Sequence, residues 1–562
     1  MKSRLYTIRR GALSLLILFT LLNVQAFAQT GGTAPAKTAQ LSAVEKKLTG
    51  NISVASIKSF TNALSADEME GRGTMQPGGD KAAKWIADRF KALGLKPLGD
   101  QGSYLQAIKF KETVLTSKTS FQIGDETFKS GEDYGFVPLP FKKENSSLEG
   151  DLIFFGYGTQ VFSSKAGVNP FAEVKGKIVV LAEGPPESIS QEDWEGTGAA
   201  FKILQGLMIS GAKSVIIIGN GRDSDSTATQ IDYFGRRQIA LADESDSFMP
   251  FSVPPIVMVN QNAAQKLFAK SGKNRQEALT EAENKEFKPF ALGQTANITT
   301  EFKTTLGTSS NVIGYIEGSD PKLKAEAVIF SAHYDAYGLD NGKIYNGAAD
   351  NALGTAEMLS VAEAFSKMSP KPKRSLVFLA VTGEEYGLYG SKYWARNPTW
   401  DILKVAADLN LDGIGTEVYG PVKIMVGYGA EHSTLGAMFE DAAAAYGVRV
   451  IPDPVPSEKV FYRSDHYSFV ERGVPALMLM GAPGIDPESL IKRIRAWEKA
   501  NYHQPTDDVM ADWDWSGAKT VADVMGVMGL RAANAPAMPQ WLKTSRFADL
   551  KRGNTGELPE EQ

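Results

Sequence analysis

The feature that most constrains the fold is a series of almost continuously apolar segments that begins near Asn311. Strands without alternating polar residues are buried on both faces, as in sheets that helices cover. Helical patterns lie between several of these segments, at residues 352–368, 434–446 and 517–531. The chain therefore predicts an α/β fold with a mixed, mostly parallel sheet covered by helices on both faces. The apolar segments are NVIGYIEG, AEAVIFSAHYD, RSLVFLAVTGEE, VAADLNLDGIG, VKIMVGYG and VPALMLMG.

A different pattern of residues precedes these apolar segments. Between about Ser117 and Pro289 short β-rich runs alternate with turns and with helical stretches such as GAAFKILQGLMISGA. We expect an inserted, β-rich α/β domain over residues 117–290. Residues 49–116 and 291–536 then form the two parts of the main domain. The Pro-, Lys- and Glu-rich residues 537–562 are expected to be a mobile C-terminal tail.

The N-terminus carries a targeting pattern. Four cations precede the apolar run ALSLLILFTLL, and AFA at Ala26–Ala28 matches a small-x-small cleavage site. The run is shorter than the roughly 18 apolar residues of a membrane span, which argues against a stable membrane anchor. Residues 1–28 are predicted to be a signal peptide and 29–48 a flexible leader. The expected location is therefore periplasmic or secreted.

Composition excludes several kinds of site. The chain has no Cys, so it has no disulfides, and any metal site must use His and carboxylates. The formal net charge of −5 becomes 56 − 65 = −9 once the four cations of residues 1–28 are removed. No Lys/Arg run stands out, so nucleic acid is not an expected partner.

Ionisable residues cluster where the predicted strands end. His333, the pair Glu384/Glu385, and Asp412 each follow a different apolar segment. The carboxyl ends of strands in such a sheet share one rim, where ligands gather. Asp350 opens a predicted helix, and His503 precedes the last one. Taken singly, an Asp here is usually a turn former or helix cap, and a lone His is usually a satisfied polar residue.

The set as a whole fits two zinc-type ions. Imidazole and carboxylate are suitable zinc ligands, and two ions about 3.5–4 Å apart share one carboxylate. Five ligands, two His and three acids, would serve such a pair. A sixth group would remain as an unligated base.

The motifs AHYDAYG, GAADNALGTA, TGEEYGLYGS, NLDGIG and NYHQPTDD resemble, in content and order, those of the M28 family of co-catalytic zinc peptidases. The resemblance covers about Asn311 to Met525, and the helices of residues 56–98 resemble the family's N-terminal part. It implies a zinc-exopeptidase fold, which is phosphorylase/hydrolase-like. The insertion, with GKIVVL, GAKSVIIIGN and VPPIVMV, is similar to a protease-associated (PA) domain.

The resemblance also implies roles for individual residues and two Zn²⁺ per chain. It assigns His333 and Asp412 to one zinc, Glu385 and His503 to the other, and Asp350 to a bridge between them. Glu384 is implied to be the general acid/base for a metal-bridging hydroxide. Asp335 is expected to orient His333, and Tyr502 to help stabilise the oxyanion.

The other two histidines receive no ligand role. His466, in YRSDHYSFVERGVPALML, is either a substrate-pocket residue or a structural one. His432, in YGAEHSTLG, is expected to be a surface or cap residue.

The predicted function is that of an exported di-zinc exopeptidase, an aminopeptidase whose partner is a peptide substrate. Carboxypeptidase- or dipeptidase-type specificity on the same site remains an alternative. A glutaminyl cyclase with one zinc is a second alternative, and a non-catalytic, receptor-like relative is a third. Side-chain preference, oligomeric state and the role of the insertion stay open.

Overall fold

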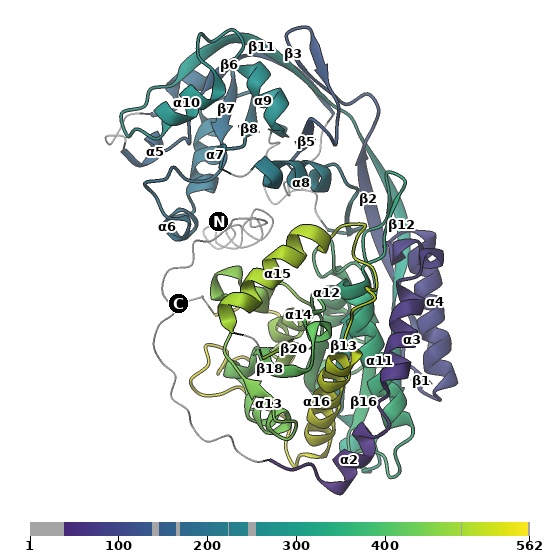
Figure 1. The fold of residues 1–562 in the computed structure, drawn as a ribbon. Helices are drawn as coiled ribbons and strands as arrows, with labels where there is room; N and C mark the ends of the chain where they lie inside the picture. Colours follow the sequence, from purple (N-terminus) through teal and green to yellow (C-terminus); the bar gives the residue numbers. More distant parts are fainter. Residues whose placement is uncertain are drawn as a thin grey trace. The chain divides into compact units, whose positions relative to one another are not determined.

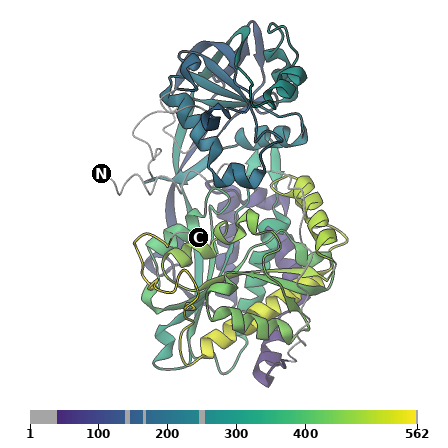
Figure 2. The same ribbon diagram turned by 90° about the vertical axis from the view of Figure 1, so that its left-hand side faces the viewer.

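The computed structural model describes residues 39–137, 145–163, 169–222, 224–244, 254–484 and 486–559. Within these ranges the chain divides into two compact units. Unit 1 consists of Glu112–Gln238 and Glu244–Thr305, and unit 2 of residues 39–111, Ile239–Asp243 and residues 306–559. Both units are drawn in Figure 1 and, turned by 90°, in Figure 2. The signal peptide predicted for residues 1–28 lies outside the described residues.

Unit 2 is built on a ten-stranded sheet with the order β19-β18-β20-β17-β13-β16-β12-β2-β9, and β1 pairs with β12. The centre is parallel, because β13 runs parallel to both β16 and β17, and β17 runs parallel to β20. β12 and β18 are antiparallel to their central neighbours. The strands are β1 (Lys96–Pro97), β2 (Leu105–Leu115), β9 (Gln238–Leu241), β12 (Phe302–Ile316), β13 (Ala327–His333), β16 (Ser375–Val381), β17 (Val405–Leu411), β18 (Val422–Tyr428), β19 (Arg449–Val450) and β20 (Ala476–Pro483).

Helices cover both faces of this sheet. Along β13, Val328 and Phe330 belong to one hydrophobic core, while Ile329 belongs to another on the opposite face. In Figure 1, α11 and α16 lie along the sheet on the face of the first core. The mixed, helix-covered α/β fold predicted from the apolar segments is thereby confirmed. The helices of unit 2 are α2 (Ala43–Thr49), α3 (Val54–Leu64), α4 (Pro77–Ala92), α11 (Leu353–Ser366), α12 (Tyr389–Arg396), α13 (Leu435–Ala444), α14 (His466–Glu471), α15 (Pro487–Asn501) and α16 (Trp515–Asn534).

Unit 1 has its own eight-stranded sheet, in the order β4-β3-β11-β6-β7-β8-β10-β5. Its central strands β6, β7, β8 and β10 run parallel to one another. The strands are β3 (Ser120–Ile123), β4 (Glu126–Phe128), β5 (Tyr134–Phe136), β6 (Ser146–Phe154), β7 (Ile178–Ala182), β8 (Ser214–Ile218), β10 (Ile256–Val259) and β11 (Phe290–Thr300). The helices are α5 (Gln160–Ser163), α6 (Gln191–Gly196), α7 (Ala199–Ile209), α8 (Ser224–Phe234), α9 (Gln261–Leu267) and α10 (Arg275–Ala282).

The limits of the insertion differ from those predicted. Residues 291–305 were expected in the main domain, but β11 pairs with β3 and β6 and so belongs to unit 1. Residues 239–243 fall within unit 2 although they lie inside the predicted insertion. Pairing between distant segments decides such boundaries, and composition does not reveal it. The assignment of unit 1 as a PA domain stays a prediction.

Both predicted flexible ends contain ordered structure. Helix α2 overlaps the end of the expected leader, and a capping box between Ser42 and Glu45 starts it. In the expected mobile tail, the Phe547 side chain is fully buried and Arg552 donates to the carbonyl of Val405. Polar composition suggested mobility, but a few apolar side chains anchor each segment. Within the described residues, no helix is both long and apolar enough to cross a membrane.

Candidate metal centre

The three predicted strand-end positions lie at one edge of the unit 2 sheet. His333 is the last residue of β13, and it is in register with Val381, the last residue of the parallel strand β16. Glu384 and Glu385 follow β16 after a short turn, and Asp412 directly follows β17. Parallel pairing therefore brings together residues that are far apart in the sequence.

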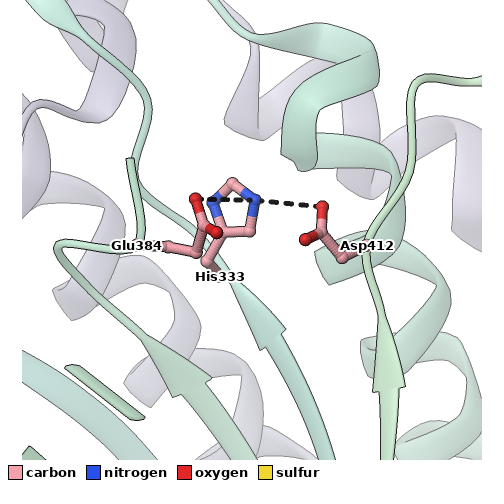
Figure 3. A group of neighbouring side chains, drawn as sticks. All are labelled: His333, Glu384 and Asp412. Atoms are coloured by element: carbon pink, nitrogen blue, oxygen red, sulfur yellow. Dashed lines mark hydrogen bonds and ion pairs between the residues drawn. The ribbon is translucent and has the colours of Figure 1, made fainter. Parts of the chain in front are cut away.

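One group consists of His333, Glu384 and Asp412 (Figure 3). The Nε2 atom of His333 lies 3.2 Å from Oδ1 of Asp412 and 3.9 Å from Oε2 of Glu384. In Figure 3 the two carboxylates approach the imidazole from opposite sides. The His333 ring is buried, whereas the two acids retain some exposure. The group thus presents one imidazole and two carboxylates to a common point.

A second group consists of Asp350, Glu385 and His503. The Nε2 atom of His503 lies 3.0 Å from Oε2 of Glu385 and 3.3 Å from Oδ2 of Asp350. The other oxygen of Asp350, Oδ1, lies 3.3 Å from Nε2 of His333. Asp350 therefore contacts the imidazoles of both groups, one with each carboxylate oxygen.

The backbone around Asp350 is held by an acid that sequence reasoning missed. Asp350 lies in a π-helical turn over Ala348–Ala352, just before α11, and its own dihedral angles are not helical. Asp507 accepts the backbone N–H groups of Ala349 at 2.9 Å and of Asp350 at 3.1 Å. Asp350 was expected to open a helix directly. The motif NYHQPTDD contains Asp507 four residues after His503, which was the available signal.

His333 is oriented by a different atom of Asp335 from the one expected. The ring Nδ1 lies 3.1 Å from the Asp335 carbonyl oxygen and 3.8 Å from its carboxylate. The carboxylate instead accepts the backbone N–H of Glu384 at 3.3 Å and the hydroxyl of Thr74 at 3.3 Å. A metal-bound imidazole can donate its other ring N–H either to a carboxylate or to a backbone carbonyl, and either partner fixes the orientation of the ring. The Asp335 side chain thus positions Glu384 as well.

Two further contacts were absent from the prediction. The hydroxyl of Ser464 donates to Oδ2 of Asp412. The hydroxyl of Tyr337 lies 3.3 Å from Nδ1 of His503, on the ring nitrogen that faces away from the carboxylates. Ser464 lies in the motif YRSDH and Tyr337 in the motif AHYDAYG, but the spacing of the residues in these motifs does not indicate either contact.

Electrostatics show that the two groups suit bound cations. Burial lowers the pKa of His333, but the carboxylates of Glu384 and Asp412 outweigh it and raise that pKa well above the usual value. Burial likewise lowers the pKa of His503, but Glu385 and Asp350 raise it to about 9. Burial, reinforced by neighbouring carboxylates, raises the pKa of Glu384. The two groups together contain four acids and two imidazoles, so a bound cation would offset their negative charge. Carboxylates and imidazoles are also the ligands that zinc accepts.

The remaining predicted residues fall into different places. Tyr502 stacks on His503, with ring centroids 3.6 Å apart, and lines a cavity beside the two groups. His466 is fully buried against Phe461 and does not line that cavity. Its position therefore favours a structural role over a role in the substrate pocket. His432, expected to be a surface or cap residue, is half-buried between Phe461 and Phe547.

Arg72 stabilises the backbone of the same region. Its side chain is fully buried and donates to the carbonyls of Tyr334, Asn346 and Gly347 at 2.6–2.8 Å, and to that of Leu64 at 2.7 Å. Burial lowers the pKa of Arg72 to about 10, and Asp507 and Asp335 oppose that shift, so the group stays charged at neutral pH. The guanidinium thus ties together the segments that follow β13.

Replacing Arg72 with Met should lower the free energy of unfolding by about 3 kcal/mol or more, because four buried carbonyls lose their donor. Guanidinium-induced unfolding of the full chain would measure this loss. Lys91→Met, on the exposed side of α4, is the matched control and should change stability by less than about 0.5 kcal/mol. Equal stability of the two variants would show that Arg72 does not hold these segments.

The comparisons with known proteins agree with this geometry. Residues 311–528 match the model of peptidase family M28. An aminopeptidase from Aneurinibacillus sp. strain AM-1 aligns with 88% of this chain and 97% of its own, at 21% identity and a TM-score of 0.56. BSAP, a zinc aminopeptidase from Bacillus subtilis, aligns with 89% and 98%, at 18% identity and a TM-score of 0.54. These two likenesses establish the fold.

The match to a peptidase family and the two groups of metal-ligating side chains therefore coincide within residues 311–528. The match to peptidase family M28 over residues 311–528 agrees with the resemblance of the motifs.

Curated relatives match over shorter stretches. The vacuolar membrane protease of Clavispora lusitaniae is 35% identical over 107 residues, which are 19% of this chain and 10% of that protein. The chain thus aligns with only about a tenth of that relative's length. The same name recurs among other matched relatives.

These names contradict the predicted periplasmic or secreted location, because they place the relatives at a vacuolar membrane. The prediction rested on residues 1–28. A basic segment followed by an apolar run directs a chain to a membrane, but it does not specify the final compartment.

Proposed function

We propose that this chain is a di-zinc exopeptidase of the aminopeptidase type. The observation that carries the proposal is the position of Asp350, whose two carboxylate oxygens each lie 3.3 Å from a different imidazole. A carboxylate placed in this way suits a bridge between two ions. His333 and Asp412 would hold one zinc, and Glu385 and His503 the other.

Glu384 is proposed as the general acid/base. When bound, the zinc ions act as Lewis acids that polarise the scissile carbonyl and make nearby water more acidic. Glu384 takes the proton of the attacking water and then delivers it to the leaving amine. Its carboxylate lies 3.9 Å from His333 Nε2, farther than Asp412 or Asp350, so it is close to the site without being the nearest ligand. Burial raises the pKa of Glu384.

Tyr502 is proposed to donate a hydrogen bond to the substrate carbonyl oxygen as charge develops there. Burial raises its pKa well above the usual value, and the carboxylate of Asp350 adds to that rise, so the phenol keeps its proton. Stacking on His503 fixes the ring, and the Tyr502 side chain faces the cavity beside Glu384. The aminopeptidase type is favoured because the two aligned structures are both aminopeptidases.

A panel of small substrates tests this function. We expect leucine amide to be hydrolysed, and N-acetyl-leucine amide to be cleaved at least about 100-fold less efficiently in kcat/KM, because the free amine must be recognised. Cleavage restricted to N-blocked dipeptides with a free carboxylate would indicate a carboxypeptidase instead. Formation of pyroglutamate from N-terminal glutamine, without peptide hydrolysis, would indicate a glutaminyl cyclase.

A further inference from the structure

The backbone at His503 gives its imidazole less support than the backbone at His333 gives to the other ring. His333 is the last residue of β13, whereas His503 lies in a turn after α15. The φ of 58° at His503 places a non-glycine residue in the left-handed region, which is unfavourable unless neighbouring groups hold the residue there. The orientation of this ring therefore depends on contacts with other side chains.

Two tyrosine rings contact the imidazole of His503. Tyr502 stacks on it with ring centroids 3.6 Å apart, and Tyr337 meets it edge-on with centroids 4.7 Å apart. Tyr337 is itself held in place, because it is buried and packs against the rings of Tyr345 at 6.3 Å and Tyr386 at 5.7 Å. The Tyr337 hydroxyl thus approaches His503 from a fixed, buried position.

The Tyr337 hydroxyl contacts two members of the second metal-ligand group. It donates to the carbonyl oxygen of Glu385 at 3.4 Å and lies 3.3 Å from Nδ1 of His503. A carbonyl oxygen can only accept and a phenol has one proton, so the phenol oxygen is left to accept from Nδ1–H. Nδ1 then carries the ring proton of the neutral imidazole. Nε2, which faces Glu385 and Asp350, keeps the lone pair that a metal ion requires.

The two imidazoles obtain this support from the same segment but from different kinds of group. The motif AHYDAYG contains both His333 and Tyr337. Nδ1 of His333 lies 3.1 Å from the carbonyl oxygen of Asp335, which is a backbone atom of its own segment. Nδ1 of His503 instead meets a side-chain hydroxyl from another part of the chain. A substitution can therefore remove the second contact without disturbing the first.

We propose that Tyr337 is a positioning residue for the second metal-ligand group. Its hydroxyl holds His503 with Nε2 toward Glu385 and Asp350, and so determines how tightly that group binds zinc. This inference rests on the di-zinc part of the proposed function. Changes to the partners of metal ligands alter metal affinity by about 10–100-fold, which sets the size of the expected effect. The group that contains His333 should not depend on this hydroxyl.

Tyr337→Phe tests the assignment, because it removes the hydroxyl and keeps the ring. In zinc titrations of the full chain against a competing chelator, one site should weaken by about ten-fold or more and the other should stay within about three-fold of wild type. Excess zinc should restore turnover of leucine amide to within about three-fold of wild type, because mass action refills the weakened site. Tyr386→Phe is the matched control, since Tyr386 packs against Tyr337 but belongs to neither metal-ligand group.

Thermal unfolding separates positioning from a purely structural role. Without zinc, Tyr337→Phe should unfold within about 2 °C of Tyr386→Phe. The rise in Tm on adding a fixed amount of zinc should be smaller for Tyr337→Phe than for the control, because this rise falls as zinc binding weakens. A clearly lower Tm for metal-free Tyr337→Phe, or wild-type affinity at both of its sites, would overturn the inference.

The outcomes also distinguish this inference from the proposed function. If the wild type binds two zinc ions but cleaves no substrate with a free amine, the proposed function fails, and the affinities of Tyr337→Phe still decide the role of Tyr337. Equal weakening of both sites in Tyr337→Phe would overturn the inference and leave the function standing. A wild type that binds fewer than two zinc ions would overturn both.

Discussion

Replacing Glu384 with Gln is expected to lower kcat by about 10²–10⁴-fold while the zinc content of the protein stays unchanged. The amide has the same shape, but it cannot accept the proton of the attacking water. The three closer neighbours of the two imidazoles, Asp350, Glu385 and Asp412, are untouched by this change. Steady-state kinetics on leucine amide, together with zinc analysis of the purified protein, would measure both effects.

Glu68→Gln is the matched control, because Glu68 is exposed and belongs to neither metal-ligand group. It should have wild-type kcat. A Glu384→Gln protein with near-normal kcat would show that another group moves the proton. A variant that lost zinc as well as activity would instead make Glu384 a ligand.

Replacing the next residue, Glu385, with Ala is expected to remove bound zinc. The Glu385 carboxylate lies 3.0 Å from Nε2 of His503 and supplies one of the negative charges of the second group. Loss of a direct ligand should weaken zinc binding by more than about 100-fold, because changes even to the partners of ligands cost about 10–100-fold. Zinc analysis after dialysis against a weak chelator, and the increase in melting temperature on adding zinc, would report the loss.

The contrast between the two neighbours is the sharpest test of the site. Glu384→Gln should keep zinc and lose turnover, and Glu385→Ala should lose zinc together with turnover. Full zinc occupancy in Glu385→Ala would exclude Glu385 as a ligand. Retention of one zinc of two, with His333 and Asp412 intact, would agree with separate sites that share Asp350.

Much of the fold could be predicted because the signal was local. The unbroken apolar runs around Val328 and Val377 require burial on both faces, and the cores on the two sides of the sheet confirm that requirement. Boundaries were predicted less well. Strand β11 pairs with β3, far away in the sequence, and Phe547 is buried although it lies in a polar tail. The local composition of a segment predicts neither the strand with which it pairs nor the side chains against which it packs.

For the candidate site, the sequence alone determined which ionisable residues follow the strands and in what order. His333, Glu384, Glu385 and Asp412 could be found because parallel strands must end at a common edge. Only the tertiary structure decided that Asp350 faces both imidazoles and that Asp335 meets His333 through its carbonyl oxygen. It alone showed the apolar cavity between β18, β20 and α15. The physical reason is that distances between side chains depend on how distant elements pack, whereas strand ends depend on the local pattern of apolar residues.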